Sequence, residues 1–112
     1  MQSQHRLHYP RKKVEELPPA EADILPAQRG DSIELDEMWT FVGRKQPATW
    51  LWLAVSYQTG QILSFAIGER DEATGYEMFA AIPKDYARKP VYTDGYAVYP
   101  NIVPAWRHRP RP

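Results

Sequence analysis

The chain has 112 residues, which is enough for one small domain and too few for two. Its 14 basic residues balance its 14 acidic ones, so net charge gives no argument for a nucleic-acid partner. It has no cysteine, which excludes disulfides, thiolate metal sites and cysteine nucleophiles, and its three histidines lie near the two ends, which argues against a histidine-built site. No apolar run is long enough to cross a bilayer, and the start lacks the apolar core of a signal peptide. We therefore expect a cytoplasmic protein without a membrane partner.

Residues 1–30 are predicted to form an extended arm that leads into the domain. Apolar residues are sparse there, and Pro18 and Pro19 begin an acidic spacer. The short basic run Arg11–Lys13 is predicted to be solvated surface, with contact to a phosphate backbone as the alternative.

The first strand is predicted over residues 31–42, where bulky apolar residues alternate with polar ones. Because strand side chains point alternately to two faces, Glu34 and Asp36 share one face, and Glu37 lies on the other. A carboxylate in the middle of an apolar strand is costly to bury without a partner, so Asp36 is a candidate functional residue. The alternative is an edge strand with one solvated face. Glu34 is expected either to support a site at Asp36 or to be solvated, and Glu37 either to lie on the surface or to support such a site.

Two further strands are predicted over residues 49–57 and 62–68. The first of them is a nearly continuous apolar run, which is typical of a central strand covered on both faces. Short turns join the three strands, so they are predicted to form an antiparallel meander. Their tryptophans are predicted to be core residues, with base stacking as the alternative: Trp39, Trp50 and Trp52.

The pattern then changes to that of a helix, predicted over residues 71–82. Asp71 is the expected N-cap, because its carboxylate can accept from the unpaired amides of the first turn. Tyr76 and Phe79 fall at helical spacing and are expected to face the core. Pro83 is expected to end the helix.

A short fourth strand is predicted at residues 91–94, ended by Gly95. A helix between the third and fourth strands implies a crossover, which places the fourth strand parallel to the first. Asp36, in mid-strand, and Asp94, at the carboxyl end of its neighbour, would then face each other, where open α/β sheets gather ligands. The predicted fold class is therefore α/β: a three-stranded antiparallel meander, a crossover helix and a parallel fourth strand.

Two neighbouring carboxylates repel each other, and a cation between them removes the repulsion. Mg²⁺ or Mn²⁺ suits such oxygen ligands, and pairs of these ions serve nucleases and polymerases. Glycosidases also work with two carboxylates, so glycoside hydrolysis is the alternative. The order of strands and helix favours metal-ion chemistry at Asp36 and Asp94.

The last residues, 105–112, are predicted to be a basic, proline-rich tail. The arginines in it could bind phosphate groups, and a solubilising tail without structure is the alternative. The candidate nucleic-acid-binding residues are Arg107, Arg109 and Arg111.

Four short motifs follow one another along the chain: Ile33–Gly43, Trp50–Trp52 with Ala54, Thr59–Leu63 and Tyr92–Tyr96. Together they resemble the catalytic region of bacterial insertion-sequence transposases, above all the InsB-like members of the family named after insertion sequence one. The resemblance runs from about residue 30 to residue 104. It implies a ribonuclease-H-like fold and the acidic triad of DDE enzymes, with Asp36 as the first acid and Asp94 as the second.

The family carries its third acidic residue on a helix after the fifth strand, whereas no residue between Gly95 and Pro112 is acidic. Family proteins usually also carry a DNA-recognition region before the catalytic domain. We therefore expect residues 31–104 to be a partial catalytic core, in a chain truncated at both ends. The resemblance implies a fragment of a DNA transposase, with Mg²⁺ or Mn²⁺ for phosphodiester hydrolysis and strand transfer, and DNA as partner. Exposed sheet surface would favour a homo-oligomer. The alternative is a non-catalytic remnant that binds DNA or oligomerises.

Overall fold

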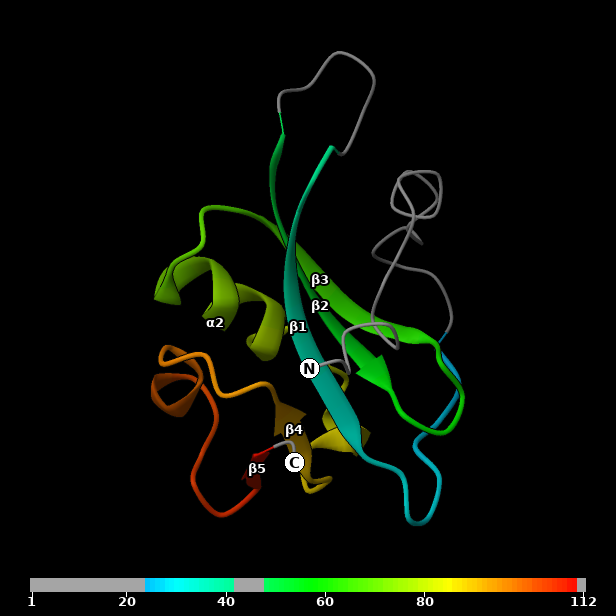
Figure 1. Ribbon diagram of the computed structural model, residues 1–112. Coiled ribbons are helices and arrows are strands. Elements are labelled where there is room, and N and C mark those ends of the chain that lie inside the picture. Colours follow the sequence, from blue (N-terminus) through cyan, green and yellow to red (C-terminus); the bar gives the residue numbers. More distant parts are fainter. Residues whose placement is uncertain (1–23, 42–47, 111–112) are drawn as a thin grey trace.

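The computed structural model describes residues 24–41 and 48–110, which form a five-stranded sheet with a helix packed on one face (Figure 1). The strands are β1 (Ile33–Thr40), β2 (Thr49–Ser56), β3 (Ile62–Gly68), β4 (Val91–Thr93) and β5 (His108–Pro110). The helix is α2 (Glu72–Ala80), and two short 3₁₀ turns follow it, η2 (Lys84–Tyr86) and η3 (Tyr99–Asn101). The strand order across the sheet is β3-β2-β1-β4-β5.

The first three strands form the predicted antiparallel meander. β1 pairs with β2 along its whole length, from Ile33 opposite Ser56 to Thr40 opposite Thr49. β2 pairs in turn with β3, with one irregularity in register near Val55. Apolar strand-length segments and short connections were sufficient signals here, because neighbouring strands need little chain to pair.

The crossover is also confirmed. β4 runs parallel to β1, with Ile33 opposite Val91 and Glu34 opposite Tyr92. The helix α2 lies between β3 and β4 in the chain, as a parallel connection requires. The Asp71 side chain caps α2 by accepting from the backbone N–H of Thr74 at 2.9 Å. The mixed α/β class follows from these pairings.

The inward face of α2 differs from the prediction. Tyr76 is exposed, and the buried residues of the helix are Gly75 and Met78. A Cβ atom on Gly75 would lie 2.6 Å from Ile102 Cδ1 and 2.9 Å from the Trp52 ring, so only glycine lets the helix approach the sheet this closely. The expectation for Tyr76 was wrong because a hydrophobic pattern does not register a glycine as a contact residue.

The main core lies between the sheet and α2, and β2 is buried on both faces. Trp52 and Ala54 belong to the core on the helix side, whereas Leu51, Leu53 and Val55 form a second cluster on the other side. The prediction of a central strand is confirmed. Each fully buried large apolar side chain contributes roughly 1.5–3 kcal/mol of transfer free energy, so β2 stabilises the sheet more than its length suggests.

Both ends of the described chain pack on the domain. Residues 108–110, expected in a tail, form strand β5 at the sheet edge beside β4. Pro110 is tolerated there because an edge strand needs hydrogen bonds on one side only. At the other end, Leu25 exchanges hydrogen bonds with the Gln61 side chain, and the backbone N–H of Ala27 donates to Asp85. Most of the predicted arm, residues 1–23, lies outside the described residues. Within the described part of the chain, no helix has the length and apolarity to cross a membrane.

Candidate functional site

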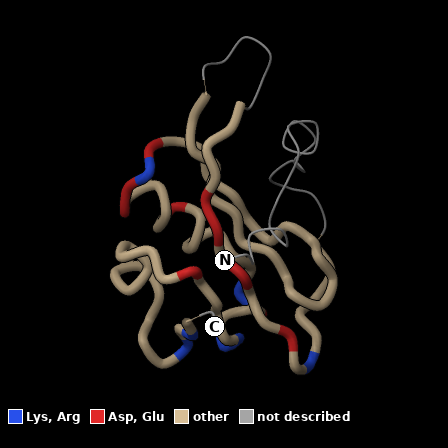
Figure 2. Tube along the Cα trace, in the orientation of Figure 1, with Lys and Arg blue, Asp and Glu red and all other residues tan. Residues whose placement is uncertain are grey.

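The sheet register brings Asp36 and Asp94 together. Glu34 lies opposite Tyr92 in the parallel pair, and each aspartate is two residues further along its own segment. β4 ends at Thr93, so Asp94 stands at its carboxyl end, beside the middle of β1. Figure 2 shows the acidic positions of β1 and of the segment after β4 close to each other, whereas several basic positions gather near the C-terminus.

A third carboxylate joins the two aspartates. One carboxylate oxygen each from Asp36, Glu37 and Asp94 lies within 4.8 Å of the others. We call these three residues the acidic cluster. Taken as whole residues, Asp36 and Glu37 are half-buried and Asp94 is exposed. Sequence reasoning placed Glu37 on the opposite face, in a surface or supporting position, and the expected separation of its carboxylate from Asp36 and Asp94 was wrong. Among the described residues, the pairing of β1 with β4 ends at Glu34, which leaves an open strand edge beside Asp36 and Glu37.

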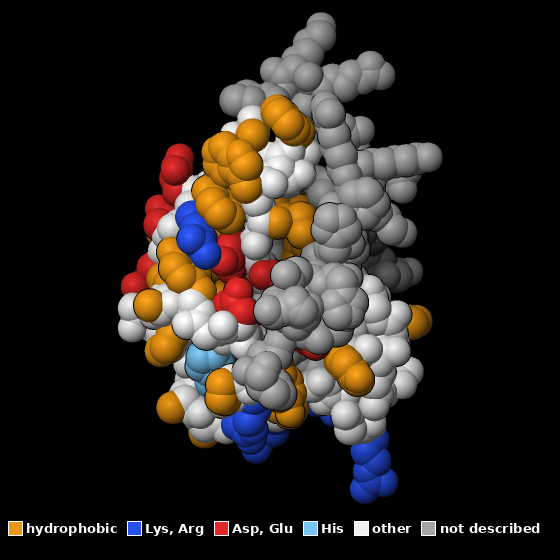
Figure 3. Space-filling model, in the orientation of Figure 1, with side chains coloured by type: hydrophobic (Ala, Val, Ile, Leu, Met, Phe, Trp, Pro, Cys, Tyr) orange, Lys and Arg blue, Asp and Glu red, His pale blue; other side chains and the backbone are white. Residues whose placement is uncertain are grey.

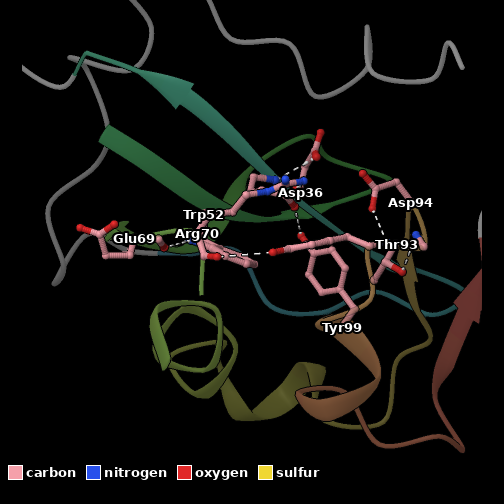
Figure 4. A network of polar contacts seen from close by, with 10 residues as sticks. Asp36, Trp52, Glu69, Arg70, Thr93, Asp94 and Tyr99 are labelled. Atoms are coloured by element: carbon pink, nitrogen blue, oxygen red, sulfur yellow. Dashed lines mark hydrogen bonds and ion pairs between the residues drawn. The ribbon is translucent and has the colours of Figure 1, made fainter. Parts of the chain in front are cut away.

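Glu37 is held firmly by two partners from distant parts of the chain. The hydroxyl of Tyr99, at the start of η3, donates to Glu37 Oε1 at 2.6 Å. Arg70 Nη2 forms a salt bridge with Glu37 Oε2 at 2.8 Å, and the Glu37 side chain is only 3% exposed. A buried carboxylate is stable when charge-assisted hydrogen bonds satisfy its oxygens, as they do here. Figure 4 shows Arg70 and Tyr99 beside Asp36 and Asp94.

The electrostatics of Arg70 and Tyr99 reflect this negative environment. The hydrogen bond to Glu37 is the main cause that raises the pKa of Arg70, and nearby Asp94 adds to it. Burial is the main cause that raises the pKa of Tyr99 well above its usual range, and the charges of Glu37, Asp36 and Asp94 act in the same direction. Tyr99 therefore stays protonated and remains a hydrogen-bond donor to Glu37.

Local hydrogen bonds fix the Asp94 segment. Asp94 Oδ1 accepts from the backbone N–H of Tyr96 at 3.0 Å, a turn that Gly95 permits with a φ of 92°. The buried hydroxyl of Thr93 lies 2.7 Å from His108 Nε2 on β5. These contacts hold the backbone on both sides of Asp94, and β5 therefore supports the site from the next strand.

Of the three predicted arginines, the structure describes Arg107 and Arg109, and both make their hydrogen bonds away from the acidic cluster. Arg107 is buried and donates to the backbone carbonyls of Tyr86 and Lys89, which argues against the phosphate contact predicted for it. Arg109 is exposed on β5 and donates to the carbonyls of Trp106 and His108. Arg111 lies outside the described residues.

The tryptophans and Glu34 also depart in part from expectation. Trp52 is fully buried, as predicted, whereas Trp39 is 61% exposed and Trp50 is half-buried. The core prediction for Trp39 was wrong because the alternating pattern continues past the end of the covered sheet. Glu34 is buried, so the solvated position considered for it is also wrong.

The donor set of the acidic cluster suits a hard divalent cation. Carboxylate oxygens are the ligands that Mg²⁺ and Mn²⁺ prefer, and three of them converge here. Two of the three side chains, Asp36 and Asp94, accept hydrogen bonds from nearby backbone amides, at Glu37 and Tyr96. Glu37 already serves Arg70 and Tyr99, so the two aspartates fit the role of ligands better.

Comparison with known proteins agrees with the motifs. A model of the IS1 transposase family matches residues 32–109. The chain is 35% identical over 75 residues to the insertion element iso-IS1n protein InsB of Shigella dysenteriae. The aligned stretch covers 67% of this chain and 56% of that protein. The chain thus spans about half the length of this curated relative, and no solved structure matches it. Because the match extends over most of the domain and includes both aspartates, this chain belongs to the IS1 transposase family.

Proposed function

We propose that this chain provides the two-aspartate part of a DDE-type catalytic site, which binds Mg²⁺ or Mn²⁺ and acts on the phosphodiester bonds of DNA during transposition. The observation that supports it most is the convergence of the Asp36 and Asp94 carboxylates at the carboxyl end of β4. Family membership supplies DNA as the substrate class. The antiparallel meander followed by a crossover to a parallel strand beside the first supports a ribonuclease-H-like fold for the domain.

In this proposal Asp36 and Asp94 hold the ion. When bound, the ion would activate the attacking oxygen and stabilise the leaving oxygen of phosphoryl transfer. The chain itself fixes the two carboxylates: β1 holds Asp36 in mid-strand, and the turn at Gly95 orients Asp94. Asp94 is exposed, and its Oδ1 accepts from the Tyr96 amide, so the carboxylate is held in place and accessible to a ligand.

Glu37 has a different task from the two aspartates. Its carboxylate positions Arg70 and Tyr99, and its charge adds to the negative potential that attracts a cation. Arg70 partly balances this charge, and its side chain is 41% exposed next to the site. We assign Glu37 as a positioning residue, because both of its oxygens are already engaged by protein donors.

Binding of the ion can be tested by nuclear magnetic resonance. Titration with Mn²⁺ should broaden the backbone signals of residues 36–37 and 94–96 first, since a paramagnetic ion acts on nearby nuclei. Asp36→Asn and Asp94→Asn should abolish this selective broadening, whereas Glu77→Gln, an exposed carboxylate on α2, should retain it. Broadening centred elsewhere, or unchanged in Asp36→Asn, would reject the metal site.

A second candidate is a DNA-binding module without catalysis. The observation that favours it is that Glu37 is committed to Arg70 and Tyr99, which leaves two carboxylates to hold an ion. A loosely held ion loses much of the positioning that phosphoryl transfer requires. Nicking of supercoiled plasmid with Mn²⁺, lost in Asp36→Asn and Asp94→Asn but not in Glu77→Gln, would decide for catalysis. DNA binding without any nicking would decide for the module.

A further inference from the structure

A row of four side chains leads from the outer end of β1 and β2 to the acidic cluster: Trp39, Trp50, Arg70 and Tyr96. We propose that this row, the aromatic strip, is a stacking site for unpaired DNA bases beside the candidate metal site. The proposal rests on the proposed function, which brings DNA to this surface. It adds a ligand chemistry, the face of a nucleobase, which neither the acidic cluster nor the family match assigns.

Each member of the aromatic strip contacts the next one in space. Trp39 lies opposite Trp50 in the antiparallel pair, and their ring centroids are 5.4 Å apart at an angle of 59°. The Arg70 guanidinium lies 4.9 Å from the Trp50 ring centroid and 4.0 Å from that of Tyr96. Arginine above an aromatic face is held by cation–π attraction, so the strip is an ordered surface.

Packing does not account for the outer end of the strip. Trp39 is 61% exposed, although Trp52, two residues beyond Trp50 on β2, is fully buried. An indole ring this exposed loses the burial that normally stabilises a tryptophan in a sheet. Figure 3 shows hydrophobic side chains on this face, with a basic side chain and then acidic ones next to them. An exposed flat ring in such a row is suited to receive another flat ring.

The inner end of the strip is part of the acidic cluster's own hydrogen bonding. Tyr96 donates its backbone N–H to Asp94, and Arg70 forms the salt bridge with Glu37. Glu37 and Trp39 are two residues apart on β1 and therefore lie on the same face of the strand. A DNA strand whose phosphate lies at Asp36 and Asp94 thus has the strip beside it for a neighbouring base.

An unpaired base fits the strip better than a duplex or a second copy of the chain. A base in a duplex is stacked on both faces, whereas an unpaired base presents a face that any aromatic ring can accept. A symmetric contact between two copies would bring Arg70 towards Arg70 and one acidic cluster towards the other, which repel. Arg70 offers a nucleotide a guanidinium that can stack on a base and attract a phosphate.

The test measures binding of a short, fluorescently labelled single-stranded oligonucleotide of mixed sequence to the full chain, at low salt and without divalent ions. Trp39→Leu should raise the dissociation constant roughly 5- to 150-fold, the range expected for one lost base–aromatic stack. Trp39→Phe should restore part of the affinity, because phenylalanine keeps an aromatic face. The same sequence as a duplex should bind with no dependence on Trp39.

Trp106→Leu is the matched control, since Trp106 is 62% exposed and lies outside the strip. An unchanged affinity in Trp39→Leu, or an equal loss in Trp106→Leu, would overturn the proposal. A Trp39→Leu effect seen only in the sedimentation of the protein would assign the strip to self-association and also overturn it. Failure here differs from failure of the proposed function, because Mn²⁺ broadening at Asp36 and Asp94 is measured without DNA.

Discussion

Carboxylates lie just before β1 and in its middle, and their surroundings differ in kind. Just before the strand, Asp31 is 1% exposed and accepts three hydrogen bonds from neutral donors: the backbone amides of Ser32 and Gln58 and the Ser56 hydroxyl, at 2.7, 3.0 and 2.6 Å. Further along the strand, the acidic cluster brings like charges within 4.8 Å of one another. The first arrangement joins the start of β1 to the end of β2. The second concentrates charge.

This contrast separates a structural carboxylate from a candidate ligand. Three donors around one buried carboxylate compensate for its lost hydration, so Asp31 stabilises the fold. Three carboxylates that share a small space repel one another, and the protein supplies the Arg70 guanidinium to one of them. In the proposed function a bound divalent ion would reduce this repulsion, so the acidic cluster would be less stable without the ion than with it.

The largest difference between the two regions should appear in stability. Asp31→Asn replaces an acceptor with an amide that faces existing donors, so we expect a loss of roughly 2–3 kcal/mol in the free energy of unfolding. Asp36→Asn removes a charge from a repelling group and should cost less than about 1 kcal/mol, or stabilise. Urea unfolding of both variants checks this. Equal losses at the two positions would contradict the contrast.

Glu37 shares features of both regions, and its substitution should have an intermediate effect. Glu37→Gln weakens the salt bridge to Arg70 and the bond from Tyr99, while it also relieves repulsion within the acidic cluster. We expect a net loss of about 1–2 kcal/mol in the free energy of unfolding. Tyr99→Phe should cost less in the Glu37→Gln background than in the wild type, since the hydrogen bond that it removes is already weaker there. Additive losses in such a double-mutant cycle would show that the two do not interact.

A divalent ion should stabilise one region and not the other. Mn²⁺ at about ten times its dissociation constant should add roughly 1.4 kcal/mol to the stability of the wild-type chain. Asp36→Asn and Asp94→Asn should remove this gain, and Asp31→Asn should keep it in full. Thermal unfolding with Mn²⁺ and with EDTA measures the gain. A gain that persists in Asp94→Asn would place the ion away from the acidic cluster.

The sequence was sufficient for the features that depend on neighbouring residues. Alternation predicted β1, and apolar runs bounded by turns predicted β2 and β3. The Asp71 cap marked the start of α2, and the helix between β3 and β4 implied the parallel pairing that brings Asp36 and Asp94 together. The pairing followed because chain connectivity restricts a crossover to few topologies.

The remaining parts depend on contacts that no local pattern encodes. Glu37 contacts Arg70 and Tyr99, which are 33 and 62 residues away along the chain. The open edge of β1 beside Glu37 depends on where the pairing with β4 ends. β5 has three residues, one of them proline, so composition alone indicated a tail. Its pairing is stabilised from the interior by Arg107, which donates to backbone carbonyls at η2 and beside it.

The smallest change in stability should come from acid pH, and it concerns only the region of the acidic cluster. Burial lowers the pKa of His108, whose Nε2 lies 2.7 Å from the Thr93 hydroxyl beside Asp94. The neutral imidazole is therefore favoured in the folded state, and its contribution to stability is present above the unfolded pKa of about 6.5. This contribution is lost as the pH falls through the lower folded value, because the folded state then takes up a proton at a cost.

His108→Gln removes the titrating group, so the stability difference between wild type and variant should shrink as the pH falls from about 7.5 to about 5. Trp106→Leu removes no titratable group and should differ from wild type by a constant amount over the same range. Urea unfolding at several pH values measures both. A stability difference for His108→Gln that stays constant would mean that His108 titrates alike in the folded and unfolded chain, and β5 would then support Asp94 by packing and not through a neutral histidine.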